Sequence, residues 1–442
     1  MPPPVAPSPP TVALLPWGAL FDEDYLDTIG VPLEVFCTEM AGGHLFNFVD
    51  ALQTVGVRTV LVLFSRRVDR PTRFVNAATG ATVLAIPPSR LYGVLRDTLR
   101  RPRVRRWLRA PGRAVRELAD EAVSFLATPL ASLARELRTE GCHALVCQEY
   151  EFVRFDLCVL LGRRMRIPIF ASFQGGNQLQ GRLQRISRPW ALRYCDGVII
   201  APGTEIERVR ASYGVPAAKI AQIFNAVEPS AFDAPPRAQA RAALGLPEHA
   251  RVAVWHGRVD RHTKGIDVLI DAWELVCQGR PDTDLRLLLV GTGSDAAWLH
   301  DRLRHANVRG VEWRDEFVAD RASLRRYLAA GDVYAFPSRH EGFAVAPLEA
   351  MACGLAIVAA DAPGIPDLLA DGEASGGIMV RRGDPAAFAA ALGRVLDDPS
   401  WARRMGDNAR ARIEACCSLE HVGRQLRAFL LGPRASAPVA GR

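Results

Sequence analysis

The stretch that decides the fold is VYAFPSRHEGFAVAPLEAMACG, residues 333–354. A short apolar run leads through a polar loop into a helix-like segment, which is typical of a parallel α/β sheet. Pro347 suits the first helical position, so Glu349 is expected in the first turn and Glu341 in the loop. Backbone N–H groups around Phe343 to Ala346 would then face an anion.

The same alternation of apolar runs and amphipathic stretches recurs along the whole chain. The first half contains TVLVLFS, HALVCQE, IPIFASF and GVIIAPG, and the second contains VAVWHG, LRLLLVG, VYAFPS and LAIVAAD. A chain of 442 residues exceeds one usual core, so two doubly wound α/β domains are predicted. The predicted divisions are a flexible lead-in over 1–30, an N-terminal domain over 31–225, a linker over 226–250, a C-terminal domain over 251–415, and a final helix with its tail over 416–442.

Composition indicates a soluble globular protein, with 49% hydrophobic and 23% charged residues. No stretch reaches the roughly 18 apolar residues that a membrane span requires. The proline-rich N-terminus has no basic residue ahead of its apolar part, which argues against a signal peptide. Nine cysteines without a CxxC pair favour reduced thiols in the cytoplasm over a disulfide frame or a zinc site.

Nine arginines lie between Arg96 and Arg116, against one acid, Asp97. Such a run suggests contact with the phosphates of nucleic acid or of anionic lipid, but a solvated helical face explains it equally well. Pro102 and Pro111 limit any helix here to about two turns.

Charged residues follow the first strand of the second half, where RVDRHTKGID places Arg258 and Lys264 in one loop. Two fixed cations at a strand end suit a diphosphate, although a pair of surface cations is the alternative. Combined with residues 333–354, they fit a nucleotide diphosphate sugar: Glu349 can accept the ribose hydroxyls, Glu341 can hold the sugar, and the cations can hold the phosphates. Either glutamate alone would be explained as an ordinary surface acid.

These segments resemble the retaining glycosyltransferases of the GT-B fold, specifically the family 4 group. The resemblance lies in HGRVDRHTKGID, LLLVGTGSD, VYAFPSRHEGFAVAPLEAMACG and ADAPGIPDLLADGEASGGIMVRRGD, which cover nearly all of residues 250–385. It implies two Rossmann-like domains facing each other across a cleft. It also implies that SLEHVGRQLRAFLL is the helix that crosses back to the first domain.

The resemblance assigns roles residue by residue. Arg258 and Lys264 would bind the donor diphosphate in place of a metal, so no metal or other cofactor is expected, and Glu341 would complete the catalytic group. The expected donor-binding residues are Gly42, Gly43, Gly257, Gly342, Phe343, Ala344, Val345 and Glu349.

Acceptor or sugar contacts are expected from His44, Glu149 and Gln174. A packed or solvent-facing role remains as plausible for His44. Gln174 stands where many family members carry a histidine, and a glutamine cannot carry a proton. Glu149 and Glu151 are alternative cleft carboxylates, with helix capping or surface exposure as the plainer explanation.

The predicted function is retaining, metal-independent transfer of a hexose to a glycan, a lipid-linked acceptor or a small molecule, in polysaccharide biosynthesis. A cytoplasmic protein is expected, peripheral on the inner membrane face through Arg96–Arg116, with no nucleic-acid partner. The alternatives are a catalytically degenerate scaffold, a two-domain sugar-binding protein, which would need a secretion signal, and a sugar-nucleotide epimerase. The donor base, the donor sugar and the acceptor stay open.

Overall fold

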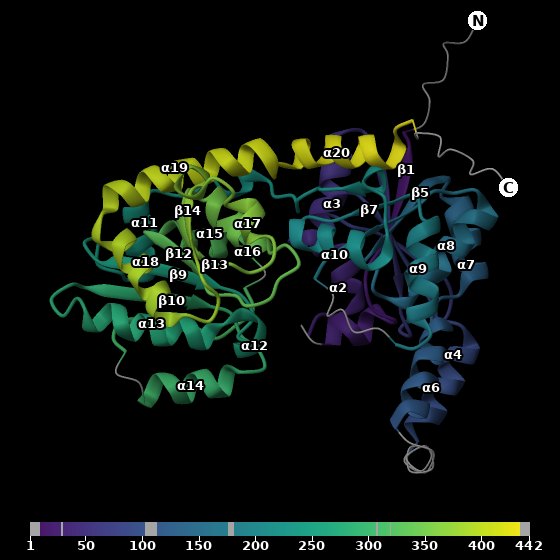
Figure 1. The fold of residues 1–442 in the computed structure, drawn as a ribbon, viewed down its shortest axis with the longest axis horizontal. Coiled ribbons are helices and arrows are strands. Elements are labelled where there is room, and N and C mark those ends of the chain that lie inside the picture. Colours follow the sequence, from purple (N-terminus) through teal and green to yellow (C-terminus); the bar gives the residue numbers. More distant parts are fainter. Residues whose placement is uncertain are drawn as a thin grey trace, which may run out of the picture. The chain divides into compact units, whose positions relative to one another are not determined.

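The computed structural model describes residues 9–27, 30–101, 113–175, 181–305, 308–318 and 320–433. Its contacts divide the chain into two compact units. The first unit comprises Met1–Ile200, Arg208–Ile223 and Val422–Arg442, and the second comprises Ala201–Glu207 and Phe224–His421. Each unit is an α/β sheet with helices, as the sequence predicted (Figure 1).

The described residues of the first unit form an eight-stranded sheet in the order β3-β4-β2-β1-β5-β6-β7-β8. Only the β3–β4 pair among these is antiparallel. The strands are β1 (Thr11–Leu15), β2 (Arg58–Phe64), β3 (Thr72–Val75), β4 (Thr82–Ile86), β5 (Cys142–Gln148), β6 (Ile169–Ser172), β7 (Gly197–Ile199) and β8 (Ile220–Ala221).

Helices connect these strands, and two helices span the division between the units. The helices of this part are α2 (Leu33–Thr38), α3 (Gly43–Thr54), α4 (Arg90–Arg100), α6 (Arg113–Phe125), α7 (Leu130–Thr139), α8 (Val153–Met165) and α9 (Gln184–Tyr194). The division falls inside α10 (Gly203–Tyr213) and near the start of α20 (Leu419–Leu431). Short turns of other helix types are η1 (Asp22–Leu26) and η2 (Ala217–Lys219).

Strand β1 corrects the prediction of a flexible lead-in over residues 1–30. All five of its residues are buried, and it lies between β2 and β5. A parallel strand covered on both faces needs only a short apolar run, and TVALL supplies one before Pro16 interrupts it. The prolines that precede this run are typical of a flexible segment, which is why residues 1–30 were predicted to be one.

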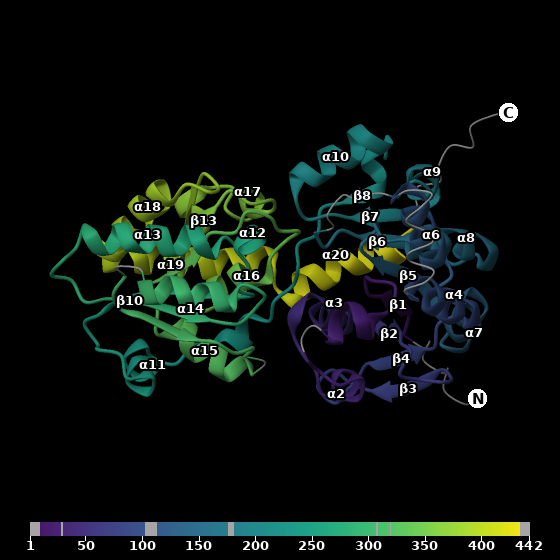
Figure 2. The ribbon, with the colours of Figure 1, turned by 90° about the horizontal axis from the view of Figure 1, so that it is seen from below.

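The second unit has a six-stranded parallel sheet in the order β11-β10-β9-β12-β13-β14, of which Figure 2 labels β10 and β13. Its strands are β9 (Arg251–His256), β10 (Leu285–Val290), β11 (Val311–Arg314), β12 (Val333–Phe336), β13 (Ala356–Ala360) and β14 (Gly377–Val380). Its helices are α11 (Arg237–Leu244), α12 (Arg261–Lys264), α13 (Ile266–Gln278), α14 (Ala296–His305), α15 (Arg321–Ala329), α16 (Val345–Ala352), α17 (Ile365–Leu368), α18 (Pro385–Asp397) and α19 (Pro399–Cys416), with short turns η3 (Pro229–Phe232) and η4 (Gly372–Ser375).

Side chains of β9 alternate between two apolar cores, one on each face of this sheet. Ala253 and Trp255 pack with residues of α13 and α18. Val252 and Val254 pack with residues of α16 and α19. Because successive residues of a strand point to opposite faces, an unbroken apolar run satisfies both cores at once.

Residues 226–250, predicted as a linker, are grouped with the second unit. Ala240 of α11 and Leu246 are buried in the core that also contains α16. At the other end of the chain, α20 packs within the first unit: a Cβ at Gly423 would lie 2.0 Å from the carbonyl oxygen of Ala51. Only glycine permits this approach, and it fixes α20 against α3.

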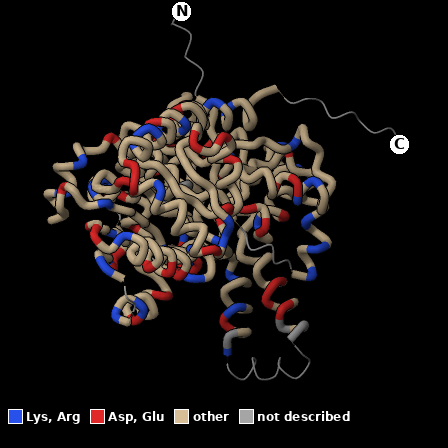
Figure 3. Tube along the Cα trace, turned by 60° about the vertical axis from the view of Figure 1, so that its left-hand side comes forward, with Lys and Arg blue, Asp and Glu red and all other residues tan. Residues whose placement is uncertain are grey.

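No helix in the described ranges is long and apolar enough to cross a membrane. All nine cysteines are free thiols. Along most of the chain that the structure describes, Lys and Arg are interspersed with Asp and Glu, as Figure 3 shows.

Candidate functional site

Arg258 follows directly after β9 and Gly257, at the carboxyl end of the sheet. Its side chain is 56% exposed and its Nη2 lies 3.5 Å from Oδ2 of Asp260. The other oxygen of Asp260 accepts the N–H of Thr263 at 2.9 Å and so caps α12. Burial alone would raise the pKa of Asp260, but the hydrogen bonds from Thr263 and the charge of Arg258 outweigh it and lower that pKa.

Lys264 and Glu341 meet, although 77 positions separate them in the sequence. The Nζ of Lys264 donates to both carboxylate oxygens, at 2.7 and 2.9 Å. Glu341 is 8% exposed, so this carboxylate is compensated by the lysine in a largely dry place. The structure therefore joins two of the three predicted catalytic residues.

A glycine and an ion pair hold the Lys264 turn against the loop after β12. Gly265 has φ +65°, and a Cβ there would lie 2.3 Å from the carbonyl oxygen of Pro337. Arg339 donates to both oxygens of Asp267 at 2.7 Å each. Burial alone would raise the pKa of Asp267, but the hydrogen bonds and charge of Arg339 outweigh it and lower that pKa.

The turns after β9 and β10 also touch through glycines. Gly291 has φ +133°, and a Cβ there would lie 1.9 Å from the carbonyl oxygen of Gly257. A Cβ at Gly293 would lie 2.9 Å from the Cγ of Arg258. The GTG sequence, an unspecific turn signal by itself, is thus required for the position of Arg258.

Glu349 lies on α16 and its Oε2 is 3.0 Å from the Nε2 of His256. Helix α16 begins at Val345, which corrects the expected start: Pro347 is the third helical residue and Glu349 the fifth, in the second turn. His256 was not predicted, because one histidine at a strand end resembles any core residue. Its position directly before Gly257 and Arg258 was the available signal.

The segment from Gly342 to Val345 forms the entry to α16, and no side chain caps this helix. The ring of Phe343 stacks on Phe224, with centroids 4.7 Å apart and planes within 7°. The buried Nδ2 of Asn225 donates to the carbonyl oxygen of Phe343 at 2.7 Å. Asn225 therefore fixes the loop between the two glutamates, a role that sequence reasoning missed.

Tyr334 of β12 contacts His256 and lies close enough to Glu349 and Glu341 to be affected by their charges. Its hydroxyl donates to the carbonyl oxygen of His256 at 3.2 Å, and its ring centroid is 5.3 Å from that of His256. Burial raises the pKa of Tyr334, and the charges of Glu349 and Glu341 act in the same direction. The two pairs thus share one neighbourhood, where β9 and β12 adjoin.

In the first unit, Gly42 and Gly43 open α3 with φ of +80° and +64°. Such backbone favours glycine, in agreement with a tight loop at the helix start. His44 is the second residue of this helix; its side chain lies outside the described part of the structure.

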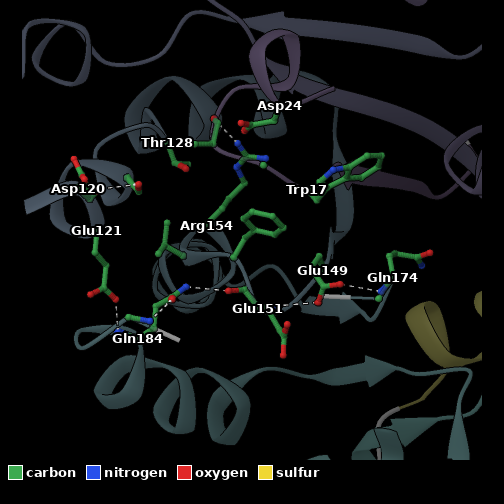
Figure 4. Close-up of a pocket in the computed structure, with 17 residues that line it drawn as sticks. Trp17, Asp24, Asp120, Glu121, Thr128, Glu149, Glu151, Arg154, Gln174 and Gln184 are labelled. Carbon is green, nitrogen blue, oxygen red and sulfur yellow. Dashed lines mark hydrogen bonds between the residues drawn. The ribbon is translucent and has the colours of Figure 1, made fainter. Parts of the chain in front are cut away.

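Glu149 and Gln174 lie together at the ends of β5 and β6, in a pocket of about 710 Å³ (Figure 4). The carboxylate of Glu149 accepts the backbone N–H of Gln174 at 3.0 Å and of Glu151 at 3.2 Å. Glu149 is 3% exposed and has φ +83°, a backbone conformation that costs a non-glycine residue free energy. The Nε2 of Gln174 donates to the hydroxyl of Ser172 at 3.3 Å.

Comparisons with known proteins find similarity to glycosyltransferases in both sequence and fold. Residues 250–398 match the family model described as glycosyl transferases group 1. D-inositol 3-phosphate glycosyltransferase of Thermobifida fusca is 32% identical over 44% of this chain and 45% of its own length. The protein of the same name from Nocardiopsis dassonvillei is 26% identical over 85% of this chain and 86% of its own. The solved structure of Anabaena HepE with UDP has a TM-score of 0.67 at 15% identity, covering 95% of this chain and 99% of that one.

Proposed function

We propose that this chain, which has the GT-B fold and matches the glycosyl transferases group 1 model over residues 250–398, is a retaining hexosyltransferase of the family 4 type. Its donor is a nucleotide diphosphate sugar, held without a metal. Its acceptor is a hydroxyl of a glycan, a lipid-linked sugar or a small molecule. This chain spans about half, 45%, of the length of the Thermobifida fusca relative. The activity in that relative's name therefore supports the proposal but is not transferred to this chain.

The observation that carries the proposal is the pairing of Lys264 with Glu341 beside that of His256 with Glu349. Both pairs lie near the carboxyl ends of β9 and β12, the two central strands where the strand order of the second unit reverses. Ligands of open α/β sheets bind at such a reversal. A cation and carboxylates at this point suit phosphates and polyols together.

In the proposed reaction, an acceptor hydroxyl oxygen attacks the anomeric carbon while the bond from that carbon to the diphosphate oxygen breaks. Attack comes from the face of the leaving group, and the hydroxyl proton passes to a phosphate oxygen. Arg258, Lys264 and the N–H groups at the start of α16 stabilise the charge that develops on the diphosphate. Glu349 accepts the ribose hydroxyls and Glu341 holds the transferred sugar.

Lys264 has to serve two anions in this scheme. In the structure its Nζ is bound to both oxygens of Glu341. An arriving diphosphate competes for that ammonium and frees carboxylate oxygens to accept sugar hydroxyls. Donor binding and orientation of Glu341 are then coupled.

A thermal-shift series with UDP-, GDP- and ADP-sugars tests the donor site. One base is expected to raise the melting temperature most, with UDP the first candidate because Anabaena HepE was solved with it. Glu349→Gln should weaken that ligand about tenfold, since hydrogen bonds to a charged group contribute roughly 1.5–3 kcal/mol. Glu312→Gln, at an exposed ion pair on β11, is the control and should leave the ligand-induced shift in melting temperature unchanged. If Glu349→Gln leaves the shift in melting temperature unchanged, Glu349 does not bind the ribose hydroxyls of the donor.

We further propose membrane contact through Arg96–Arg116. Arg96 forms an ion pair with Glu23, and Asp97 forms one with Arg66. The guanidinium of Arg96 is therefore already engaged by a carboxylate and is not free to contact a lipid phosphate. Residues 102–112, with four of the eight remaining arginines of this run, lie outside the described residues. Flotation with liposomes should require anionic lipid. Equal flotation with neutral liposomes would end the membrane assignment and leave the donor site untouched.

A further inference from the structure

Four large apolar side chains are exposed on α8 and α9, the helices of the first unit that follow β5 and β6 and pack side by side (Figures 1 and 2). Between 37% and 77% of each is exposed: Leu160, Ile186, Trp190 and Tyr194. Single exposed apolar residues are normal on a protein surface, whereas a contiguous group of them marks a place of contact.

These side chains form one continuous group. Ile186, Trp190 and Tyr194 follow one another at intervals of four residues, so they form a stripe along the outer face of α9. The ring centroids of Trp190 and Tyr194 are 5.4 Å apart. Tyr194 also contacts α8, because the Cζ of Arg163 lies 4.7 Å from its ring centroid. Leu160 is one turn before Arg163 on α8, so the apolar surface extends from one helix to the other.

The exposed charges around this stripe are of one sign. Six exposed arginines lie on the two helices or within two residues of their ends: Arg163, Arg164, Arg166, Arg182, Arg185 and Arg193. Within the described residues, none of the six forms an ion pair with a carboxylate. The only acid in α8 and α9 is Asp156, which is buried. Just beyond α9, the half-buried Asp196 accepts the N–H of Ile169 at 2.8 Å.

A buried ion pair fixes the inner face of α9 to α8. The Nε of Arg188 donates to Oδ1 of Asp156 at 2.7 Å, and the two side chains are only 0% and 3% exposed. Burial raises the pKa of Asp156, while the charge and hydrogen bond of Arg188 act against that rise. Separating the pair would leave an uncompensated buried charge, so the two helices stay together. Their outer faces are therefore presented as one rigid surface.

We propose that this surface, made of the four apolar side chains and the six arginines and here called the α8–α9 surface, binds the interfacial region of an anionic lipid bilayer. Trp and Tyr favour the depth of the lipid headgroups, where the ring is in apolar surroundings and its polar atom is hydrated. Arginines beside them reach the lipid phosphates. A helix with an aromatic stripe flanked by arginines lies in the plane of such an interface. The inference depends neither on the donor site nor on the Arg96–Arg116 run.

A protein partner is the other occupant that Trp, Tyr and Arg could serve. The charge pattern favours lipid. A protein partner offers separate acids at fixed positions and usually mixes both signs of charge around an apolar centre. Cations of a single sign around an apolar stripe instead match a continuous negative surface with an apolar layer beneath it.

Flotation of the full chain with vesicles tests the proposal. Vesicles of phosphatidylcholine with phosphatidylglycerol should bind the chain, and vesicles of phosphatidylcholine alone should bind it about tenfold more weakly or less. Arg185→Glu with Arg193→Glu should weaken binding to the anionic vesicles about 25-fold or more, since one arginine near such a surface contributes about fivefold. Arg403→Glu with Arg404→Glu makes the same change at exposed residues of α19 and is the control. Equal losses for the two pairs would assign binding to net charge and overturn the α8–α9 surface.

Apolar contact with the bilayer has its own readout. Ile186→Ser should weaken binding about tenfold, whereas Val75→Ser, at an exposed residue of β3, should leave it unchanged. Lipids with brominated acyl chains quench tryptophans that enter the bilayer, and the chain has eight tryptophans. Trp190→Phe keeps a ring at this position and should lower the quenching while binding persists. Quenching that is the same in Trp190→Phe and in the wild type overturns the proposal.

A further pair of substitutions separates this surface from the Arg96–Arg116 run. If Arg105→Glu with Arg106→Glu abolishes binding while the α9 variants retain it, the contact lies in that run and the inference is overturned. Absence of binding to every vesicle overturns it as well. A dimer in sedimentation that Ile186→Ser disrupts would then assign the surface to contact between copies of this chain. Each of these results leaves the proposed donor site untouched.

Discussion

Lys264→Ala is expected to reduce the rate of sugar transfer by about a hundredfold or more, because one electrostatic donor to the leaving diphosphate is lost. A second effect is expected to add to this loss of rate. The substitution also leaves the carboxylate of Glu341, which is 8% exposed, without its counter-ion. Transfer is measured with the donor selected in the thermal-shift series.

A double-mutant cycle separates the two effects. Lys264→Ala with Glu341→Gln removes both charges, so the free energy of unfolding should recover relative to Lys264→Ala while transfer stays slow. Arg280→Ala, which breaks an exposed pair with Asp397 in the same unit, is the control and should leave the rate unchanged. If Lys264→Ala keeps the wild-type rate, the diphosphate does not lie at this ammonium.

Gly291→Ala is expected to lower the free energy of unfolding of the second unit by roughly 2–5 kcal/mol. The added Cβ would lie 1.9 Å from the carbonyl oxygen of Gly257, and φ +133° is strained for alanine. The turn can relieve the clash only by moving Gly257, and with it Arg258. Denaturant unfolding followed by fluorescence measures the loss, with Trp313 as a local reporter because its Nε1 donates to the Gly291 carbonyl oxygen at 2.8 Å.

Gly245→Ala provides the matched comparison. Gly245 also has a left-handed backbone, φ +70°, but a Cβ there would meet nothing within 4 Å. It should cost only the conformational strain, about 1 kcal/mol. Equal losses for the two variants would mean that contact between the two glycine turns does not hold Arg258 in place.

The positions of the proposed donor-site residues were predictable because these residues follow strands within short, ordered segments. Glu341 and Glu349 share one strand-loop-helix unit, and Arg258 and Lys264 share another, so spacing alone brought them to one edge of the sheet. His256 was missed, because its one local signal, the position directly before Gly257 and Arg258, does not tell whether the ring faces a carboxylate or the core.

The pocket of the first unit was predictable only in part, since Glu149 and Gln174 were expected but their surroundings were not. Trp17 comes from the segment taken for a lead-in, and Asp120 and Glu121 come from a helix with no recognisable motif. Such a lining depends on tertiary packing, which sequence spacing does not encode.

The first unit is built from segments that precede and follow the second unit in the sequence, so the two units become complete at different times during synthesis. Residues 422–431 of α20 belong to the first unit, with Gly423 packed against α3, and they are synthesised after the second unit, which ends at His421. On the ribosome, the second unit has all its residues before the first unit has its closing helix. Synthesis of the first unit therefore begins before that of the second unit but is completed after it.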